Sequence, residues 1–368
     1  MTVLEASRAA VAVSPLETEI QEFSLPEIPP DAGLLKVDAT GICGSDWGMY
    51  QRKDPGPRIL GHEMVGTIVA LGDIARDKWG VSEGDVVALE EYLPCGYCEY
   101  CRSGEYRSCL STDSRIPGSI RYGSTPVSRD PSLWGGYSQY LYMHPRTVLH
   151  QVPDGVPNHI AAMALPIGNG FQWAVMDGGA GPGKSILIQG PGQQGLGSVI
   201  GASSAGADLI IVSGLAKDKH RLDVALELGA HHVVMVDEQN LAAEVERLTN
   251  GRMLDIVLEV SGAGPEVIND HLGLLRKRGI MQIAARKGSV ADFDMNQIIN
   301  KQITFKGLRG HSYDAVELAL GAMATGRLPL EKMSSHVIGL KDLDHALRMV
   351  GGEADEPSIH ITVEPWKE

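Results

Sequence analysis

The sequence predicts an α/β protein with two parts, a small β domain and a doubly wound parallel sheet. The first 150 or so residues are rich in Gly and Pro and contain short β-like runs. From about Ala161 onwards, short apolar strands alternate with helices, and a glycine-rich turn joins one strand to the next helix. Because strands that alternate with helices form right-handed βαβ units, the second part is predicted to be a parallel sheet.

Length, composition and charge exclude several classes of protein. The 368 residues suffice for two domains of ordinary size, and 43% hydrophobic with 21% charged residues is typical of a globular protein. The net charge of −14 disfavours nucleic acid as a partner, because a phosphate backbone requires clustered cations. No apolar run approaches the roughly 18 residues of a bilayer-spanning helix, so we expect no membrane partner.

The N-terminus and the cysteines indicate the cellular compartment. Residues Met1 to Arg8 lack a basic segment followed by a long apolar core, so we expect no signal peptide. The five cysteines have short spacings of the metal-binding kind, which indicates reduced thiols rather than disulfides. We therefore expect a cytoplasmic protein.

Short strands separated by turn residues favour a small barrel-like domain in the first part. The strands expected there are 34–39, 64–70 and 86–89. In the second part, a helix over 221–228 is expected to end with Gly229 just after it. The strands expected there are 185–189, 209–212, 232–236, 256–260 and 279–283. Beyond Phe305 the pattern changes and ends in a last strand over 359–363, and the residues alone leave open whether this tail rejoins the first part.

A glycine-rich turn, Gly190-Pro191-Gly192-Gln193-Gln194-Gly195, matches the pattern GxGxxG between a predicted strand and a predicted helix. The first glycine permits a tight turn, the second lets the backbone approach a pyrophosphate, and the third permits close helix–strand packing. The helix N-terminus attracts the phosphates. A turn without a ligand is the alternative. The context favours a dinucleotide cofactor bound by Gly190, Gly192, Gln193, Gln194 and Gly195.

The end of the next strand bears on which dinucleotide binds. Ser213 and Gly214 stand where an acidic side chain would bind the adenosine ribose of NAD. Three cations follow, Lys217, Lys219 and Arg221, and leave room for a 2′-phosphate, whereas Asp218 can reach the ribose. The residues leave both NAD and NADP open, with a slight preference for NADP.

Four cysteines lie within fifteen residues, in a lobe over about 94–110: Cys95, Cys98, Cys101 and Cys109. Thiolates at this spacing can converge on one zinc ion with a complete tetrahedral shell. A [4Fe–4S] cluster is the alternative, since closely spaced cysteines also bind it. The spacing predicts a structural zinc site.

The remaining cysteine, Cys43, is followed in the sequence by His62 and Glu63. Cys and His together bind zinc and leave one position open for water or an alcohol oxygen, whose pKa the ion lowers. Ser45 is close enough to accept a substrate proton, and Asp46 can orient His62 through its second ring nitrogen. These five residues predict a catalytic zinc site.

These segments resemble the zinc-dependent medium-chain dehydrogenase/reductase family, of the alcohol, polyol and threonine dehydrogenase kind. The matching segments run in the family's order: Gly41 to Asp46, Gly61 to Gly66, Gly84 to Val87, the four-cysteine lobe, Gly135-Gly136-Tyr137 and the glycine-rich turn. The resemblance implies a GroES-like catalytic domain over residues 1–160, an NAD(P)-binding Rossmann domain over 161–304, and a return over 305–368 that completes the catalytic domain. It also implies a homodimer or homotetramer.

The resemblance further implies site roles. Cys43 and His62 are expected as catalytic zinc ligands and Glu63 as a direct or exchanging ligand. Ser45 is expected as the first proton-relay group and Asp46 as the partner of His62. The implied reaction is hydride transfer between NAD(P) and an alcohol or carbonyl substrate through a zinc-bound alkoxide.

Two departures from the family pattern concern this reaction. Many relatives have an outer histidine relay where this chain has Gly48. Relatives also have a Cys or acidic ligand four residues before an Asn or Thr beside the nicotinamide. If Asn169 is that residue, the ligand position is occupied by Leu165, which cannot bind zinc.

Three functional hypotheses therefore stand. The first is zinc-dependent alcohol oxidation or its reverse, and the second is a reductase of the same family without a catalytic zinc, which Leu165 and Gly48 favour. The third is a non-enzymatic nucleotide-binding protein with a structural zinc, which the set around Cys43 disfavours. Five further residues are expected either to line the substrate pocket or to pack in the core: Trp47, Met49, Tyr50, Glu91 and Trp134.

Overall fold

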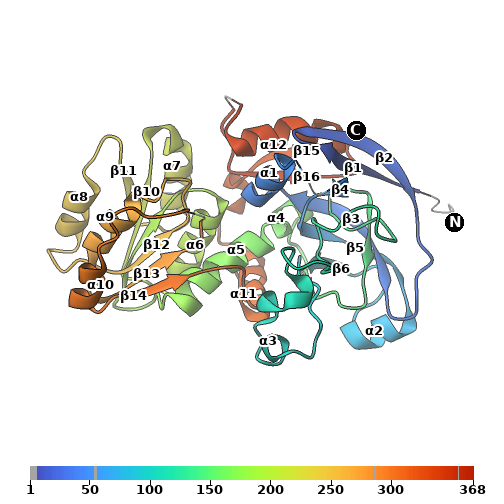
Figure 1. The fold of residues 1–368 in the computed structure, drawn as a ribbon, viewed down its shortest axis with the longest axis horizontal. Helices are drawn as coiled ribbons and strands as arrows, with labels where there is room; N and C mark the ends of the chain where they lie inside the picture. The colour runs from blue at the N-terminus through green and yellow to red at the C-terminus, as the bar shows by residue number, and fades with distance from the viewer. Residues whose placement is uncertain (1–5, 54–55, 286, 355) are drawn as a thin grey trace. The chain divides into compact units, whose positions relative to one another are not determined.

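The computed structural model describes residues 6–53, 56–285, 287–354 and 356–368 (Figure 1). Residues 1–5 lie outside this range. They belong to the N-terminal segment for which the sequence predicts no signal peptide. The chain forms two compact units: unit 1 comprises Met1–Leu165 and Ser334–Glu368, and unit 2 comprises Pro166–Met333. Over the described ranges, no helix is both long enough and apolar enough to cross a bilayer.

Unit 1 is built on two sheets, whose pairs are antiparallel except for β15 with β16. The smaller sheet has the order β2-β1-β4, and the larger has the order β15-β16-β3-β5-β6-β8 with β7 also paired to β3. The strands are β1 (Ala6–Ser14), β2 (Glu17–Ser24), β3 (Gly33–Gly41), β4 (Arg58–Ile59), β5 (Glu63–Leu71), β6 (Val86–Leu89), β7 (Tyr140–Met143), β8 (Leu149–Gln151), β15 (Ser334–Ile338) and β16 (His360–Val363).

Short helices join these strands. They are α1 (Gly44–Tyr50), α2 (Asp73–Trp79), α3 (Glu99–Arg102), α4 (Asn158–Ala161) and α12 (Leu343–Gly351), with 3-10 turns η1 (Tyr106–Ser108), η2 (Leu110–Thr112) and η6 (Leu340–Asp342). The helix α5 (Ala164–Gly170) leads from unit 1 into unit 2.

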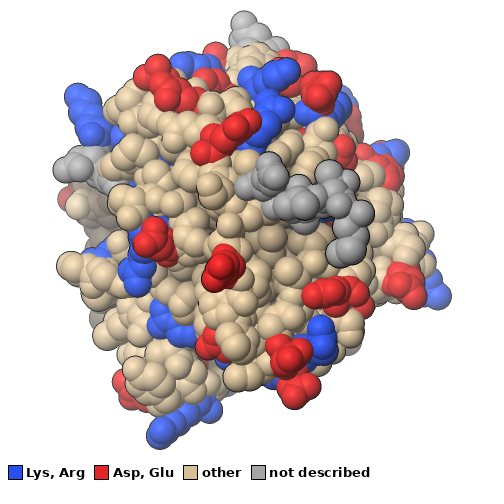
Figure 2. Space-filling model, turned by 90° about the vertical axis from the view of Figure 1, so that its right-hand side faces the viewer, with Lys and Arg blue, Asp and Glu red and all other residues tan. Residues whose placement is uncertain are grey.

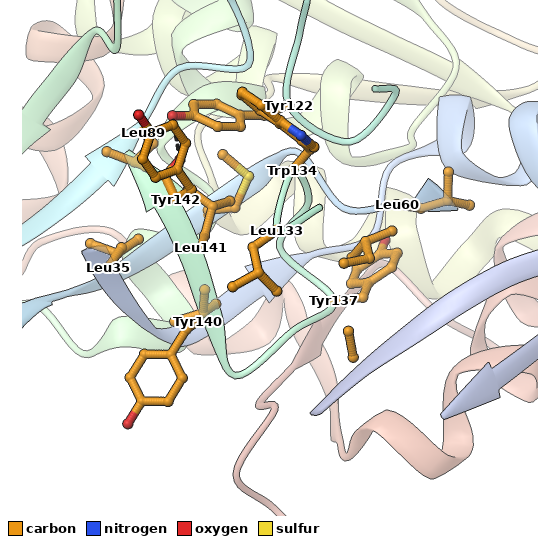
Figure 3. Close-up of a cluster of buried hydrophobic side chains, with 14 of the residues drawn as sticks. Leu35, Leu60, Leu89, Tyr122, Leu133, Trp134, Tyr137, Tyr140, Leu141 and Tyr142 are labelled. Carbon is orange, nitrogen blue, oxygen red and sulfur yellow. Dashed lines mark hydrogen bonds between the residues drawn. The ribbon is translucent and has the colours of Figure 1, made fainter. Parts of the chain in front are cut away.

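The core of unit 1 combines aliphatic side chains of its strands with buried aromatic rings (Figure 3). The ring of Trp134 meets that of Tyr142 edge-on, with centroids 5.7 Å apart. Each buried polar tip has a partner, since Trp134 Nε1 donates to the Arg129 carbonyl at 2.8 Å and the Tyr122 hydroxyl donates to the Tyr142 carbonyl at 2.9 Å. Trp134 is therefore a core residue rather than part of a substrate pocket.

Unit 2 is a six-stranded parallel sheet of order β11-β10-β9-β12-β13-β14. The strands are β9 (Ser185–Gln189), β10 (Leu209–Gly214), β11 (His232–Met235), β12 (Leu254–Glu259), β13 (Leu275–Ile283) and β14 (Thr304–Gly307). The helices are α6 (Gln193–Ser204), α7 (Lys219–Glu227), α8 (Leu241–Leu248), α9 (Val267–Leu274), α10 (Met295–Lys301) and α11 (Tyr313–Ala324), with the π-helix η3 (Phe171–Asp177) and the 3-10 turns η4 (Ala216–Asp218) and η5 (Leu330–Lys332).

Sheet order and helix contacts confirm the predicted doubly wound arrangement. The helix α6 contacts α7, while α9 contacts α8 and α10 (Figure 1). Two helix groups of this kind are what right-handed crossovers on both faces of the sheet predict. The apolar runs of β9, β10 and β12 are almost fully buried, as expected for strands covered on both faces. The strand order reverses between β9 and β12, which is where such sheets bind dinucleotides.

The boundary between unit 2 and the C-terminal return to unit 1 differs from the boundary at 304/305 that the sequence predicts. Residues Thr304–Gly307 form β14, which pairs with β13, and α11 packs on η3 within unit 2. The chain enters unit 1 at Ser334, and β16 pairs antiparallel with β3. The sequence carries little signal for β14, because this strand is four residues long and mostly exposed.

Figure 2 shows one face of the molecule, on which acidic and basic side chains are interspersed among neutral ones. On this face the excess of Asp and Glu is therefore spread rather than gathered. A mixed charged surface of this kind favours solubility.

Candidate metal centres and cofactor site

The segment with Cys43 passes from a strand into a helix. β3 ends at Gly41, α1 begins at Gly44, and Cys43 is the N-cap residue between them. Its backbone N–H donates to Asp46 Oδ2 at 2.9 Å, in the first turn of the helix. This local hydrogen bond fixes the backbone from which the Cys43 thiol projects.

Asp46 is fully buried and connects three segments of unit 1. Besides Cys43, its carboxylate accepts hydrogen bonds from the Tyr137 hydroxyl at 2.9 Å and from the Gly61 backbone N–H at 3.4 Å. It also lies 3.1 Å from His62 Nδ1, which donates because a carboxylate can only accept. The predicted contact between Asp46 and His62 is therefore present, and it leaves His62 Nε2 available for a metal.

Ligand atoms of Cys43, His62 and Glu63 all lie within 4.8 Å of one another. Burial raises the pKa of the Cys43 thiol, and the Glu63 carboxylate adds to this effect. Burial alone would lower the pKa of His62, but the carboxylates of Asp46 and Glu91 raise it well above its usual value. A cation among these groups reverses both preferences, because it favours thiolate and neutral imidazole. A partly buried S, N and O donor set of this kind fits a zinc ion.

His360 lies beside this site and was missed by the sequence reasoning. It is fully buried at the start of β16, with Nε2 3.5 Å from Glu63 Oε2. Gly41 packs against both side chains, since a Cβ there would lie 2.3 Å from Glu63 Oε2 and 2.5 Å from His360 Nε2. No local motif marks His360, because only the pairing of β16 with β3 brings it to the site.

Ser45 is exposed, and its Oγ lies 3.3 Å from His62 Nε2. Its hydroxyl therefore borders the ring nitrogen that the Asp46 contact leaves available. Gly48 is also exposed, and a Cβ at this position would meet no atom within 4 Å.

The remaining pocket candidates have structural partners. Tyr50 is 1% exposed and its hydroxyl donates to Asp344. Glu91 accepts from Arg121 Nε at 2.9 Å, while Trp47 and Met49 pack against the core of unit 1. Tyr50 therefore joins Trp134 as a residue of the core.

The four lobe cysteines converge, with all four Sγ atoms within 4.8 Å of one another. Cys98 Sγ lies 3.4 Å and Cys95 Sγ 3.9 Å from Cys101 Sγ, close to the ~3.8 Å between thiolates of a tetrahedral zinc site. A backbone hydrogen bond from Tyr97 lowers the pKa of Cys95 to about 6, whereas burial raises that of Cys101 to about 12. The lobe can thus hold one ion in a complete thiolate shell.

The lobe is joined to the sheet by buried hydrogen bonds. The Tyr106 hydroxyl donates to Glu90 Oε1 at 2.7 Å, and Leu93 N donates to Thr112 Oγ1 at 2.9 Å. Desolvation raises the pKa of Tyr106, which therefore stays protonated and able to donate. An ion in the lobe would order a segment that these contacts attach to β6.

Within unit 2, the glycine-rich turn has the geometry that the pattern requires. Gly190 has φ +108°, in the left-handed region that glycine favours. A Cβ on Gly195 would lie 1.9 Å from the Gly190 carbonyl, whereas a Cβ on Gly192 would meet nothing within 4 Å. Gly192 is the N-cap of α6, which begins at Gln193. The open position at the helix N-terminus is where a pyrophosphate can approach.

The polar residues predicted to bind cofactor have partners in unit 2. Asn169 Nδ2 donates to Gln194 Oε1 at 3.1 Å, and Asn169 Oδ1 lies 2.9 Å from His311 Nδ1. His311 is a further residue that sequence reasoning missed. Gln193 is buried at the start of α6.

The end of β10 offers no carboxylate of its own. The Ser213 hydroxyl donates to the Gln189 side chain, and Gly214 packs against Pro191. Of the three cations Lys217, Lys219 and Arg221 that follow β10, two have acidic partners: Lys219 Nζ donates to Asp223 at 2.7 Å, and Arg221 Nη1 donates to Asp218 at 3.4 Å.

Comparison with known proteins agrees with these features. The family model for the alcohol dehydrogenase GroES-like domain matches residues 29–154, and the model for zinc-binding dehydrogenases matches residues 195–325. A probable alcohol dehydrogenase of Mycobacterium tuberculosis is 33% identical over 97% of this chain and 98% of that protein. Sorbitol dehydrogenase of Bacillus subtilis is 34% identical over 77% of this chain and 76% of that protein.

Solved structures give the same result. The crystal structure of an alcohol dehydrogenase from Thermotoga maritima matches with a TM-score of 0.86 and 25% identity, over 98% of this chain and 99% of that chain. The predicted combination of a GroES-like domain and a Rossmann domain is thereby confirmed. The chain belongs to the zinc-dependent medium-chain dehydrogenase/reductase family.

Proposed function

We propose that this protein transfers hydride between NAD(P) and an alcohol or carbonyl substrate, with Cys43, His62 and Glu63 holding the catalytic zinc. The observation that carries the proposal is the approach of one sulfur, one nitrogen and one carboxylate oxygen to within 4.8 Å, with Glu63 buried and Cys43 and His62 partly buried. When bound there, zinc would lower the pKa of the substrate hydroxyl. NAD(P) would accept the hydride.

The chain's own residues orient the reacting groups and move the proton. Asp46 holds His62 in one tautomer and fixes the N-cap at Cys43, so two ligand segments depend on one carboxylate. Ser45 Oγ, next to His62 Nε2, accepts the proton that leaves the substrate hydroxyl. Because Ser45 is exposed and Gly48 offers no side-chain relay, the proton passes from Ser45 to water.

We further propose that Cys95, Cys98, Cys101 and Cys109 hold a structural zinc and that the glycine-rich turn binds the pyrophosphate of NAD(P). Ser213 and Gly214 give no carboxylate to an adenosine ribose, while Lys219 and Arg221 follow closely, which favours NADP slightly. Because both cations already have acidic partners, the preference is expected to be small. The reduced cysteines support a cytoplasmic location.

The test combines a zinc count with a survey of substrates on protein purified without chelators. We expect about two zinc ions per chain, one for each donor set. We also expect reduction of NADP+ or NAD+ with at least one class in a panel of primary, secondary and polyhydroxy alcohols. Fluorescence titration with NADPH and NADH gives the ratio of the two Kd values. About one zinc per chain together with turnover would favour the reductase that lacks a catalytic zinc.

We also propose that the protein is a homo-oligomer, a dimer or a tetramer. In the described sheet of unit 2, β14 is at the edge and pairs only with β13. Phe305 on this strand and Ile299 on α10 are exposed. The unpaired backbone N–H and C=O groups of an edge strand are a template for pairing with another chain. Light scattering after gel filtration is expected to give a multiple of the 39.4 kDa chain, and a monomeric mass at micromolar concentration would contradict this.

A further inference from the structure

The carboxyl end of β12 carries a buried group of charges outside the proposed chemistry. Glu259, the last residue of β12, is fully buried, and the Lys287 side chain is 5% exposed. Lys287 Nζ lies 2.9 Å from Glu259 Oε1, and buried His271 faces the other carboxylate oxygen at 3.4 Å. Burial, with the nearby Lys287, lowers the pKa of His271 to about 4, so this imidazole is neutral near pH 7. The group thus contains one cation and one anion.

Both partners of this ion pair also hold the turn over residues 260–263. Besides Glu259, Lys287 Nζ donates to the carbonyl oxygens of Ser261 at 3.0 Å and Ala263 at 2.7 Å. Glu259 Oε1 accepts from the Ser261 backbone N–H at 2.7 Å and from its hydroxyl at 2.6 Å. Glu259 therefore binds hydrogen-bond donors of the turn, and Lys287 binds its carbonyl oxygens.

This turn lies against the glycine-rich turn. A Cβ on Gly190 would lie 2.8 Å from Ser261 Cα, and the Val260 N–H donates to the Gln189 carbonyl at 3.0 Å. At Gly192 and Gly262 a Cβ would meet no atom within 4 Å, so both turns border open space. The two turns follow β9 and β12, between which the strand order reverses. They therefore form adjoining walls of the position where a dinucleotide binds.

A buried ion pair such as Lys287 with Glu259 contributes little to the free energy of unfolding, because desolvation of two buried charges offsets most of their attraction. The contacts instead fix the shape of one turn. We propose that Lys287 and Glu259 are positioning residues for the cofactor, which hold the 260–263 turn in the form that binds a nicotinamide dinucleotide. The inference rests on the proposed function, in which the glycine-rich turn binds NAD(P).

The first variant is Lys287→Met, tested by fluorescence titration with whichever of NADH and NADPH the wild-type protein binds more tightly. We expect Kd to rise about tenfold or more, because a flexible turn must be ordered on binding. This variant also leaves a buried carboxylate uncompensated, so its thermal midpoint is expected to fall.

A second variant separates positioning from stability. In Glu259→Gln/Lys287→Met both charges are absent, and the thermal midpoint is expected to recover most of the loss. The carbonyls of Ser261 and Ala263 still lack their donor, so Kd is expected to remain about fivefold or more above the wild-type value. A double variant that binds the dinucleotide as tightly as the wild type would overturn the proposal.

Lys301→Met is the matched control. Lys301 Nζ also donates to two carbonyl oxygens, those of Leu272 and Gly273, each at 2.9 Å. These carbonyls precede β13 and therefore lie at the opposite end of the sheet from the glycine-rich turn. We expect lower stability with an unchanged Kd, and an equal rise in Kd would show that Lys287→Met acts through general destabilisation. Wild-type protein that binds neither NADH nor NADPH would instead refute the proposed function.

Discussion

The Cys43→Ser variant is expected to lose alcohol-dependent NAD(P)+ reduction, with kcat/KM lower by about 10³-fold or more, equivalent to about 4 kcal/mol of transition-state stabilisation. The physical reason is that a serine hydroxyl does not ionise near neutral pH and cannot replace a thiolate ligand. The zinc content is expected to fall by about one ion per chain, because the separate four-cysteine lobe is unaffected. Steady-state kinetics and elemental mass spectrometry measure the two effects.

Cofactor binding is the internal control for this variant. The glycine-rich turn is formed within unit 2, whereas Cys43 belongs to unit 1, so the Kd for the reduced dinucleotide should not change. Retained binding with lost turnover would locate the defect in the metal centre. Turnover within tenfold of the wild-type value would refute the zinc mechanism and favour a reductase that does not use this metal.

Gly41→Ala is expected to damage the same centre through sterics alone. The new Cβ would lie 2.3 Å from Glu63 Oε2 and 2.5 Å from His360 Nε2, and both side chains are buried on neighbouring strands. Since both buried side chains must shift aside in a packed core, we expect a loss of about 1–3 kcal/mol in the free energy of unfolding. The displaced Glu63 carboxylate should also weaken zinc binding. Thermal unfolding and zinc retention during dialysis against a weak chelator measure the two effects.

Gly48→Ala provides the matched control, because a Cβ there would meet no atom within 4 Å. Gly48 lies inside α1, where alanine is favoured over glycine by about 0.5–1 kcal/mol. We expect unchanged zinc retention and equal or greater stability. If Gly41→Ala behaved like Gly48→Ala in both measurements, the close packing of Glu63 and His360 around Gly41 would have no functional consequence.

Much of the fold was predictable because its signals are local. Continuous apolar runs such as Ile186 to Ile188 predict buried parallel strands, and Gly229, with φ +112°, follows α7 as the sequence predicts. The strand β14 was not predictable in the same way. Its four residues have no apolar pattern, and only pairing with β13 makes it a strand, so the second unit extends to Met333.

The same distinction applies to the aromatic residues that the sequence left between pocket and core. Tyr50 and Trp134 have side chains suited to either place. The partner of Tyr50 is Asp344, far along the chain, and the ring that meets Trp134 is that of Tyr142 on the neighbouring strand β7. Composition and spacing carry no signal for such contacts.

The sequence by itself determined the family, the zinc-type spacing of the lobe cysteines and the form of the glycine-rich turn, because each depends on residues close together in the chain. Only the tertiary structure decided that Tyr137 donates to Asp46 and that His360 lies beside Glu63. It also decided that Lys287 donates to the carbonyl oxygens of the turn after β12. His360 and Lys287 reach these places through strand pairing and loop packing. Contacts across such separations depend on the register of sheets, which no short motif encodes.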